Sequence, residues 1–384
     1  MKILVISTNH THPITNGTSK FITEYCDLIR KMGHDVYFLH VTYYKLKRDA
    51  RVKNEKEVSA SSQAWGDKYF HYHTGFLDAV LSKLKYYYRQ RLCGGFGNCD
   101  DRYPTGLERY VSQLNSKYHF DGVVINYFWL SKLFLNCSIP RQAIMTHDSY
   151  TFYNKRNNMS MWFNLSPNEE AKALQRCQYI FAMQLQEAAV FSYLAPQNKV
   201  LVSFCNYRVK PQEIKNNHNL LFLSGSFKMN KIGLEWFIKE IFPEICKVYP
   251  DCCLKIGGSI CKTLKEYSDY KNIELLGFVD NPEDFFSFGD VAINPTYLGA
   301  GLKIKTFEAL SYGKIVMVHP HCTVGIFDAS NAPIFNSVKK EDWVAFLHMI
   351  WDSPSMLHEY QNRGIEYMNK MNEFIENQYK QFLA

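Results

Sequence analysis

The sequence lacks an apolar run long enough to cross a membrane, and it shows no secretory leader. Its N-terminal apolar stretch, residues 2–7, gives way at once to polar residues, whereas a leader carries about 7–15 apolar residues in a row. The most apolar longer segment, residues 179–195, is interrupted by Gln184, Gln186 and Glu187, and a spanning helix needs about 20. We therefore expect a cytoplasmic protein, with peripheral contact to the inner face of the cell membrane left open.

Metal-binding patterns are missing as well. The eleven cysteines form no Cys-x-x-Cys pair, and Cys93 and Cys99 flank a glycine-rich loop without a second pair of ligands nearby. No Asp-x-Asp motif occurs, since the acidic residues at 100–101 and 282–284 have other spacings. In a long chain without a leader, the thiols are expected to stay reduced. We expect neither a metal nor a cofactor.

Nucleic-acid-binding motifs are absent too, and the charge is mild. The formal net charge of +7 comes from dispersed Lys and Arg residues, whereas nucleic-acid-binding domains gather cations in a patch or a recognisable motif. We therefore exclude nucleic acid as a partner. Weak attraction to an anionic substrate or surface remains compatible with this charge.

What the chain does have is a pattern of strands and helices that starts twice. Residues 2–7 form a buried strand, residues 20–32 have apolar side chains at helical spacing, and residues 34–41 form the next strand. The same order returns with a strand at 219–227 and a long amphipathic helix over 231–250. Strand, helix and strand in this order predict parallel sheets. The fold class is therefore α/β, with two doubly wound, Rossmann-like domains.

Length and composition set the domain boundaries. At about 100–200 residues per domain, the 384 residues predict two domains, and a polar segment that starts near residue 206 separates them. We place an N-terminal domain at 1–205, a C-terminal domain at 206–365, and a terminal helix at 366–384 that crosses back to the N-terminal domain. Residues 45–70 are polar and show no clear period, so we predict no element there.

The most informative stretch is the loop and helix that follow the strand at 290–296. Gly299 and Gly301 allow close backbone approach, and the unpaired N–H groups at a helix start attract anions. Lys303 adds a positive charge beside them, and Glu308 lies one turn further on. This chemistry suits a diphosphate and a ribose diol. The alternative is an ordinary surface helix, in which Lys305 and Glu308 form a weak i,i+3 ion pair.

These residues carry a resemblance to a known family. The segment 299–318, GAGLKIKTFEALSYGKIVMV, resembles the donor-binding segment of GT-B glycosyltransferases of group 1, which include glycogen synthase and bacterial surface-polysaccharide enzymes. Residues 2–39 resemble the family's N-terminal unit, and residues 220–245 the first unit of its C-terminal domain. Residues 273–295 are similar to the segment that encloses the nucleotide base. The resemblance implies the GT-B fold, with two domains facing across a cleft.

The resemblance also implies a donor site in the C-terminal domain. Glu308 would contact the ribose of a nucleoside-diphosphate sugar, and Lys231 and Lys303 would bind its diphosphate. The backbone amides of Gly301 and Leu302 would hold the sugar or phosphate. The remaining residues that the resemblance assigns to the donor are the turn Gly225 and Ser226 and the base-enclosing pair Phe278 and Val279.

Two positions depart from the family's pattern. The family often has a first glutamate that touches the donor sugar, where this chain has Ala300, and an arginine where it has Ser226. We expect Lys303 to replace the lost cation. The resemblance implies metal-independent transfer with retention of configuration, but Ala300 leaves the sugar and the anomeric outcome open.

In the N-terminal domain, His147 and Asp148 follow a strand and are the candidate catalytic residues. The resemblance implies that His147 contacts the donor sugar, and Asp148 could act as the acceptor base if the enzyme inverts. The alternative for both is a structural turn or helix cap. Gly17 lies in a loop that could approach the diphosphate, and it is a turn signal in either case.

The acceptor side is represented by residues 76–92, which combine cations with Tyr and Leu side chains. Such a helix suits contact with a membrane surface and a lipid-linked acceptor; the alternative is a solvated helix with one buried face. We expect transfer from a nucleotide sugar to a glycan or lipid-linked acceptor in surface polysaccharide or glycoconjugate synthesis. The alternatives are a nucleotide-sugar epimerase of the same fold and a catalytically silent binding subunit.

Overall fold

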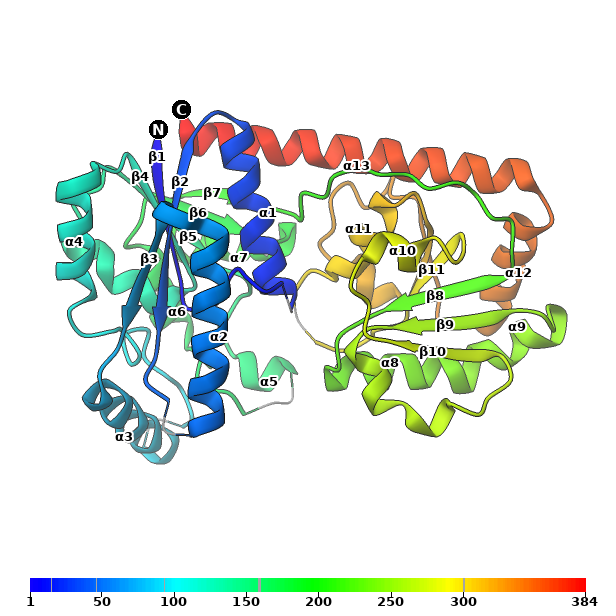
Figure 1. The fold of residues 1–384 in the computed structure, drawn as a ribbon, viewed down its shortest axis with the longest axis horizontal. Helices are drawn as coiled ribbons and strands as arrows, with labels where there is room; N and C mark the ends of the chain where they lie inside the picture. Colours follow the sequence, from blue (N-terminus) through cyan, green and yellow to red (C-terminus); the bar gives the residue numbers. More distant parts are fainter. Residues whose placement is uncertain (15, 46, 93, 158–159, 300) are drawn as a thin grey trace. The chain divides into compact units, whose positions relative to one another are not determined.

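The computed structural model describes all residues except 15, 46, 93, 158–159 and 300 (Figure 1), and it leaves out the side chain of Gln90. The chain divides into two compact units. Unit 1 contains Met1–Asn206 together with Ile375–Ala384, and unit 2 contains Tyr207–Phe374. The boundary between the two units therefore falls after Asn206. The chain returns to unit 1 at Ile375 and stays in it to the last residue.

Unit 1 is built on a seven-stranded parallel sheet in the order β3-β2-β1-β4-β5-β6-β7. Its strands are β1 (Lys2–Ser7), β2 (Asp35–Thr42), β3 (Tyr69–His73), β4 (Gly122–Asn126), β5 (Arg141–Met145), β6 (Tyr179–Ala182) and β7 (Lys199–Val202). The four apolar side chains of β1 are fully buried, as in a sheet that is covered on both faces. This explains the unbroken apolar run near the N-terminus.

The helices of unit 1 connect these strands. They are α1 (Gly17–Lys31), α2 (Arg48–Trp65), α3 (Phe76–Leu92), α4 (Leu107–Tyr118), α5 (Tyr153–Asn157), α6 (Pro167–Leu174) and α7 (Leu185–Leu194), with 3₁₀ turns at Gly66–Lys68 and Phe128–Asn136. Asn16 starts α1 with a capping box, because its side chain accepts a hydrogen bond from the Ser19 N–H at 2.9 Å. Figure 1 shows the amino terminus and the carboxyl terminus lying close together in this unit.

The absence of structure predicted for residues 45–70 is wrong. This segment forms α2 and the start of β3. The reason is that α2 buries only Ser61 and Trp65 among its residues, so it has no apolar stripe for the sequence to reveal. Trp65 stacks on Phe38 with ring centroids 5.1 Å apart, and Ser61 Oγ donates to the His12 carbonyl oxygen at 3.0 Å, so these two residues anchor the helix.

Unit 2 contains a six-stranded parallel sheet in the order β10-β9-β8-β11-β12-β13. Its strands are β8 (Asn219–Leu223), β9 (Cys253–Gly257), β10 (Ile273–Gly277), β11 (Val291–Asn294), β12 (Ile315–Val318) and β13 (Ile334–Asn336). Its helices are α8 (Lys228–Trp236), α9 (Phe242–Val248), α10 (Pro282–Phe286), α11 (Ile304–Ser311), α12 (Lys340–Trp351) and the larger part of α13 (Pro354–Leu383), with 3₁₀ turns at Ser259–Thr263, Lys265–Tyr267 and Pro320–Thr323.

The single long helix predicted over 231–250 is also wrong in detail. A π-helical turn, Phe237–Ile241, separates α8 from α9. Pro243 lies at the start of α9, and a proline cannot donate to the preceding turn and clashes with its carbonyl. The chain therefore changes its hydrogen-bond register just before this residue.

Both sheets have a point where the strand order reverses. In unit 1 it lies between β1 and β4, and in unit 2 between β8 and β11. Ligands of open parallel sheets bind outside the carboxyl ends of the strands at such a point. The loops that follow β8 and β11 in unit 2, and those that follow β1, β4 and β5 in unit 1, are therefore where a site is expected.

Lys314 precedes β12, at the edge of the sheet opposite to the carboxyl ends of the strands. It allows a test of how a buried charge affects the stability of unit 2. It is 1% exposed, and its Nζ has no hydrogen-bond partner among the described residues. Burial lowers the pKa of Lys314 from 10.5 to about 8. Below that pH the folded state must hold a charged ammonium in its core, so we predict that Lys314→Met stabilises the protein by about 2 kcal/mol at neutral pH.

The gain should shrink between about pH 8 and pH 10, because the folded state has then lost a proton that the unfolded chain still holds, so the wild type becomes more stable as the pH rises. Thermal melts of the wild type and the variant from pH 6 to pH 10 measure this, with the exposed Lys239→Met as the matched control. An equal gain at every pH would show that packing, and not the buried charge, is responsible.

Candidate functional site

The loops at the carboxyl edge of the unit 2 sheet pack tightly because glycines allow it. A Cβ on Gly258, which has a φ of +97°, would lie 2.3 Å from the carbonyl oxygen of Ser224. A Cβ on Gly233 would lie 2.7 Å from the carbonyl oxygen of Pro295. Neither contact is possible for a larger residue. These glycines therefore bring α8 and the loops after β8, β9 and β11 together at the strand-order reversal.

A lysine that the sequence analysis treated only as a surface residue lies at the centre of these loops. The Nζ of Lys305 donates to Asn230 Oδ1 at 2.7 Å, and to Ser224 Oγ and Thr296 Oγ1 at 3.3 Å each. It also lies 5.1 Å from the centroid of the Phe222 ring. The structure therefore contradicts the surface-helix alternative, because Lys305 turns inward and joins the loops after β8 and β11.

No carboxylate balances the charge of Lys305 within the described part of the chain. Its hydrogen-bond partners are an amide and two hydroxyl groups. Burial consequently lowers the pKa of Lys305 from 10.5 to about 7. An anion placed beside this group would be attracted to it and would raise its pKa again.

The two lysines that were predicted to bind phosphate are already engaged. Lys303 Nζ donates to the carbonyl oxygens of Gly299 at 2.8 Å and Gly301 at 3.3 Å, which closes the glycine loop on itself. Lys231 Nζ donates to Glu266 Oε1 at 2.9 Å, and this hydrogen bond raises the pKa of Lys231. Lys303 thus stays at the glycine loop after β11, whereas the charge of Lys231 is neutralised by the Glu266 carboxylate.

The other predicted residues of unit 2 lie around the same edge. Helix α11 begins at Ile304, where the Ile304 N–H donates back to the Leu302 carbonyl oxygen at 3.0 Å. Glu308 is half-buried in the second turn of α11. Gly225 and Ser226 form the exposed turn after β8, where the Ser226 N–H donates to Ser259 Oγ at 3.0 Å. Ala300 lies outside the described residues.

Large apolar side chains are exposed in the loops that follow four of the strands of unit 2. Phe278, directly after β10, is 74% exposed, and Val279 beside it packs toward Gly257. The other three exposed side chains follow β8, β11 and β12 and are those of Phe227, Leu298 and Val324. The edge that carries Lys305 therefore also presents apolar surface for the flat part of a ligand.

In unit 1, His147 is held in one tautomer by a buried amide. Asn126 Nδ2 donates to the Ile6 carbonyl oxygen at 3.1 Å, so Asn126 Oδ1 faces His147 Nε2 at 2.8 Å. The histidine must therefore carry its hydrogen on Nε2, which leaves Nδ1 as an acceptor. Burial lowers the pKa of His147 to about 3. The ring is thus neutral, and its φ of 64° is a conformation that functional residues often adopt.

An aromatic stack connects His147 to the start of α1. Tyr127 lies between Trp129 and His147, with centroid distances of 4.2 Å on both sides. The Tyr127 hydroxyl accepts from Asn9 Nδ2 at 2.7 Å and donates to Thr18 Oγ1 at 3.4 Å. Gly17, which precedes Thr18 as the first residue of α1, is thereby brought to the same edge as His147.

Asp148 has a partner that the sequence analysis missed. Burial raises the pKa of Asp148 to about 6, and burial together with the neighbouring Asp148 carboxylate raises the pKa of Glu187 to about 8. The titrations of the two carboxyl groups are linked, so the pair retains one proton near neutral pH, on Glu187. The signal was a carboxylate in the middle of the apolar run 179–195, which we read only as an interruption of that run.

This pair predicts that stability depends on pH. Between about pH 5 and pH 8 the folded chain keeps a proton that the unfolded chain releases, so the free energy of unfolding should fall as the pH rises. We predict that Glu187→Gln flattens this fall, because the amide cannot ionise. Melting temperatures across this range measure it, with the exposed Glu213→Gln as the control. Parallel profiles for the wild type and Glu187→Gln would contradict the retained proton.

Neither a metal-ligand cluster nor a membrane-spanning helix occurs among the residues that the structure describes. Across the residues with a described position, no group of three or more His, Cys, Asp and Glu side chains could hold a metal ion. In the same part of the chain, no helix combines the length and the apolar character that crossing a membrane requires.

Comparison with known proteins relates the chain to a family and to solved structures. Residues 218–346 match the family model described as glycosyl transferases group 1. A protein of Klebsiella pneumoniae, described as an uncharacterized 44.6 kDa protein in cps region, is 22% identical over 342 residues, which cover 80% of each chain. The family resemblance seen in the sequence is thus confirmed for most of unit 2.

Solved structures show the fold. TarM, a Staphylococcus aureus protein, superimposes with a TM-score of 0.66 at 10% identity, covering 100% of this chain and 99% of its own. The pneumococcal O-GlcNAc transferase GtfA, in complex with UDP and GlcNAc, gives 0.65 at 11% identity and covers 100% and 99%. The chain has the α/β GT-B fold with two Rossmann-like units, and the match to group 1 supports a glycosyltransferase.

Proposed function

We propose that this protein is a glycosyltransferase that takes a sugar from a nucleoside-diphosphate donor bound at the carboxyl edge of the unit 2 sheet. The observation that carries the proposal is Lys305, a partly buried ammonium group whose oxygen partners are all neutral. A diphosphate beside it would supply the missing negative charge. Lys303 and the N–H groups at the start of α11 stand at the same loop and suit the same anion.

The proposed reaction breaks the bond between the anomeric carbon and the diphosphate. Negative charge grows on the leaving phosphate oxygen in the transition state, and preorganised cations stabilise it there more than in the bound substrate. Lys305 and Lys303 would supply this charge, so we propose transfer without a divalent metal and without a cofactor. Lys231 is assigned a lesser part, since Glu266 already neutralises it.

The remaining parts of the donor have candidate partners in unit 2. The exposed ring of Phe278 offers a face for a base, and the neighbouring Val279 packs toward Gly257. Glu308, on α11, would accept hydrogen bonds from the ribose diol. The solved GtfA structure contains UDP, so uridine is the first base to test.

Unit 1 is proposed to act on the sugar and the acceptor. His147, neutral and with Nδ1 as an acceptor, would receive a hydrogen bond from a donor-sugar hydroxyl. We propose retention of configuration on the family resemblance; Asp148 would serve as the base in an inverting reaction. The relative in a cps region favours a surface polysaccharide or glycoconjugate acceptor. A lipid-linked form of this acceptor would be met at a membrane surface.

Incubation with UDP-sugars and no acceptor distinguishes the alternatives. A transferase slowly hydrolyses its donor and releases UDP, an epimerase converts the sugar without releasing UDP, and a silent subunit leaves the donor unchanged. We expect slow release of UDP or, with another donor, of the corresponding nucleoside diphosphate. His147→Ala should reduce this release by at least about tenfold without changing UDP affinity, because the side chain is assigned to the sugar.

The role of Lys305 predicts a change of protonation on binding. A diphosphate should raise the lowered pKa of Lys305, so binding near pH 8 should take up protons and affinity should fall as the pH rises above 7. Calorimetry in buffers of different ionisation enthalpy measures this for the tightest binder among UDP, GDP and ADP. Lys305→Met should weaken binding by at least about tenfold and abolish the proton uptake.

Lys247→Met is the matched control, because Lys247 is an exposed lysine on α9 that pairs with Glu244. It should bind like the wild type. If Lys305→Met retains both the affinity and the proton uptake of the wild type, the diphosphate does not lie where we place it.

A further inference from the structure

Helix α3 presents an apolar face that the described residues of unit 1 leave mostly exposed, with the Phe76 ring packed edge-on against Tyr44 at 5.6 Å between centroids. Seven of its large apolar side chains are between 51% and 73% exposed. These residues, named here the α3 face, are Phe76, Leu77, Leu81, Leu84, Tyr87, Tyr88 and Leu92. At about 100° per residue they fall within roughly half of the helix circumference. The helix follows β3 directly and lies beyond the carboxyl ends of β2 and β3 (Figure 1).

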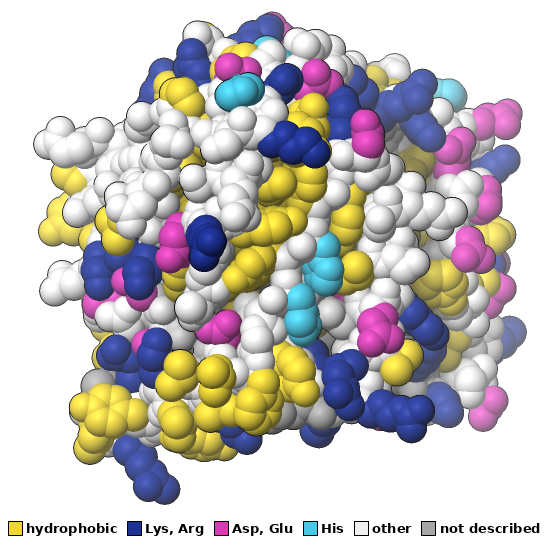
Figure 2. Space-filling view, turned by 60° about the vertical axis from the view of Figure 1, so that its left-hand side comes forward, with side chains coloured by type: hydrophobic (Ala, Val, Ile, Leu, Met, Phe, Trp, Pro, Cys, Tyr) yellow, Lys and Arg dark blue, Asp and Glu magenta, His cyan; other side chains and the backbone are white. Residues whose placement is uncertain are grey.

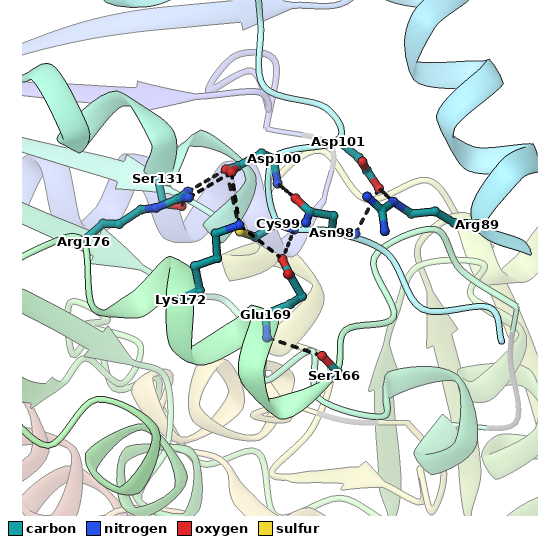
Figure 3. Close-up of polar contacts among 10 residues, drawn as sticks. All are labelled: Arg89, Asn98, Cys99, Asp100, Asp101, Ser131, Ser166, Glu169, Lys172 and Arg176. Atoms are coloured by element: carbon teal, nitrogen blue, oxygen red, sulfur yellow. Dashed lines mark hydrogen bonds and ion pairs between the residues drawn. The ribbon is translucent and has the colours of Figure 1, made fainter. Parts of the chain in front are cut away.

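The opposite side of α3 is fixed to the unit by polar contacts. Arg89 Nε pairs with Asp101 Oδ2 at 2.8 Å, and Asp78 Oδ1 accepts from Thr105 Oγ1 at 2.5 Å. Asp101 also accepts from the Asn98 N–H at 2.9 Å (Figure 3). Because these bonds hold the inner side of the helix against the unit, the α3 face points outward.

The loop that holds α3 is itself braced against α6. Arg176 donates to both carboxylate oxygens of Asp100 at 2.6 Å and 2.8 Å, and the Cys99 N–H donates to Glu169 Oε2 at 3.0 Å (Figure 3). Because Arg176 and Glu169 come from the α6 region, this network joins α3 to the core of unit 1. The α3 face is therefore a surface of the folded unit and not a detached segment.

The charge on α3 has a single sign where it meets solvent. Lys83, Lys85 and Arg91 are exposed, and at about 100° per residue the two lysines fall at the two borders of the apolar arc. The helix carries one acidic residue, Asp78, whose carboxylate is taken by Thr105 on the inner side. Figure 2 shows hydrophobic side chains gathered at the lower left of the molecule with Lys and Arg side chains around them.

We propose that the α3 face binds an anionic lipid bilayer, with α3 lying parallel to the membrane plane. Its Leu and Tyr side chains would enter the boundary between headgroups and acyl chains, while the flanking lysines reach the phosphates. A second copy of the chain fits less well, because pairing two such faces would bring the basic borders together without an acidic partner. This binding does not depend on the donor chemistry of unit 2.

Vesicle flotation with the full chain tests the proposal. Vesicles of phosphatidylcholine and phosphatidylglycerol in roughly a 2:1 ratio should bind the wild type, and phosphatidylcholine alone should bind it more weakly. The double variant Leu77→Gln, Leu84→Gln should lose at least about tenfold in affinity. Lys83→Gln with Lys85→Gln should lose about 10- to 30-fold on the anionic vesicles only, and added salt should mimic this loss.

Tyr193→Gln is the matched control, since Tyr193 is 85% exposed on α7 of the same unit. It should bind vesicles like the wild type, and all the variants should keep the wild-type melting temperature because each altered side chain is exposed. Failure of the wild type to bind anionic vesicles overturns the proposal. So does a concentration-dependent dimer in light scattering that disappears in Leu77→Gln, Leu84→Gln, since a second copy would then cover the face.

Discussion

The charge of one ammonium group constrains the whole of the proposed donor site. Lys305 satisfies its hydrogen bonds with Asn230, Ser224 and Thr296, but these partners are neutral, and within the described chain no carboxylate approaches it. Such a group is desolvated without being paired, and it becomes more stable when an anion arrives. The tight glycine contacts that draw the loops after β8, β9 and β11 together keep it in this state. The site is therefore arranged for a negatively charged ligand before any ligand binds.

Unit 1 uses the opposite arrangement. There the groups near the strand ends are buried carboxyls and a histidine that burial keeps neutral. Asn126 fixes the tautomer of His147, and the stack with Tyr127 fixes its ring plane. A sugar presents hydroxyl groups and develops positive charge at its anomeric carbon during transfer. Neutral acceptors and a carboxyl pair that retains a single proton would suit that chemistry, as cations would suit the diphosphate that we propose for unit 2.

The sequence was sufficient for the architecture where apolar patterns carry the fold. The buried strands β1 and β12 and the helix α1 follow from unbroken runs and helical spacing, and the family resemblance supplied the GT-B fold. It was insufficient where a few specific contacts decide whether a helix forms or changes its hydrogen-bond register. Helix α2 depends on Ser61 and Trp65, and the register change before Pro243 depends on local geometry. In the site, Lys305 and Glu187 were missed because inward orientation and burial, not residue type, give them their properties.

Hydrogen–deuterium exchange with the tightest-binding nucleoside diphosphate tests the central claim most directly. If the diphosphate lies against Lys305, amides of residues 224–231 and 301–308 should exchange more slowly in the complex, since both loops border that ammonium group. Slower exchange confined to the outer strands, or unchanged exchange in both segments at saturation, would contradict the placement of the donor.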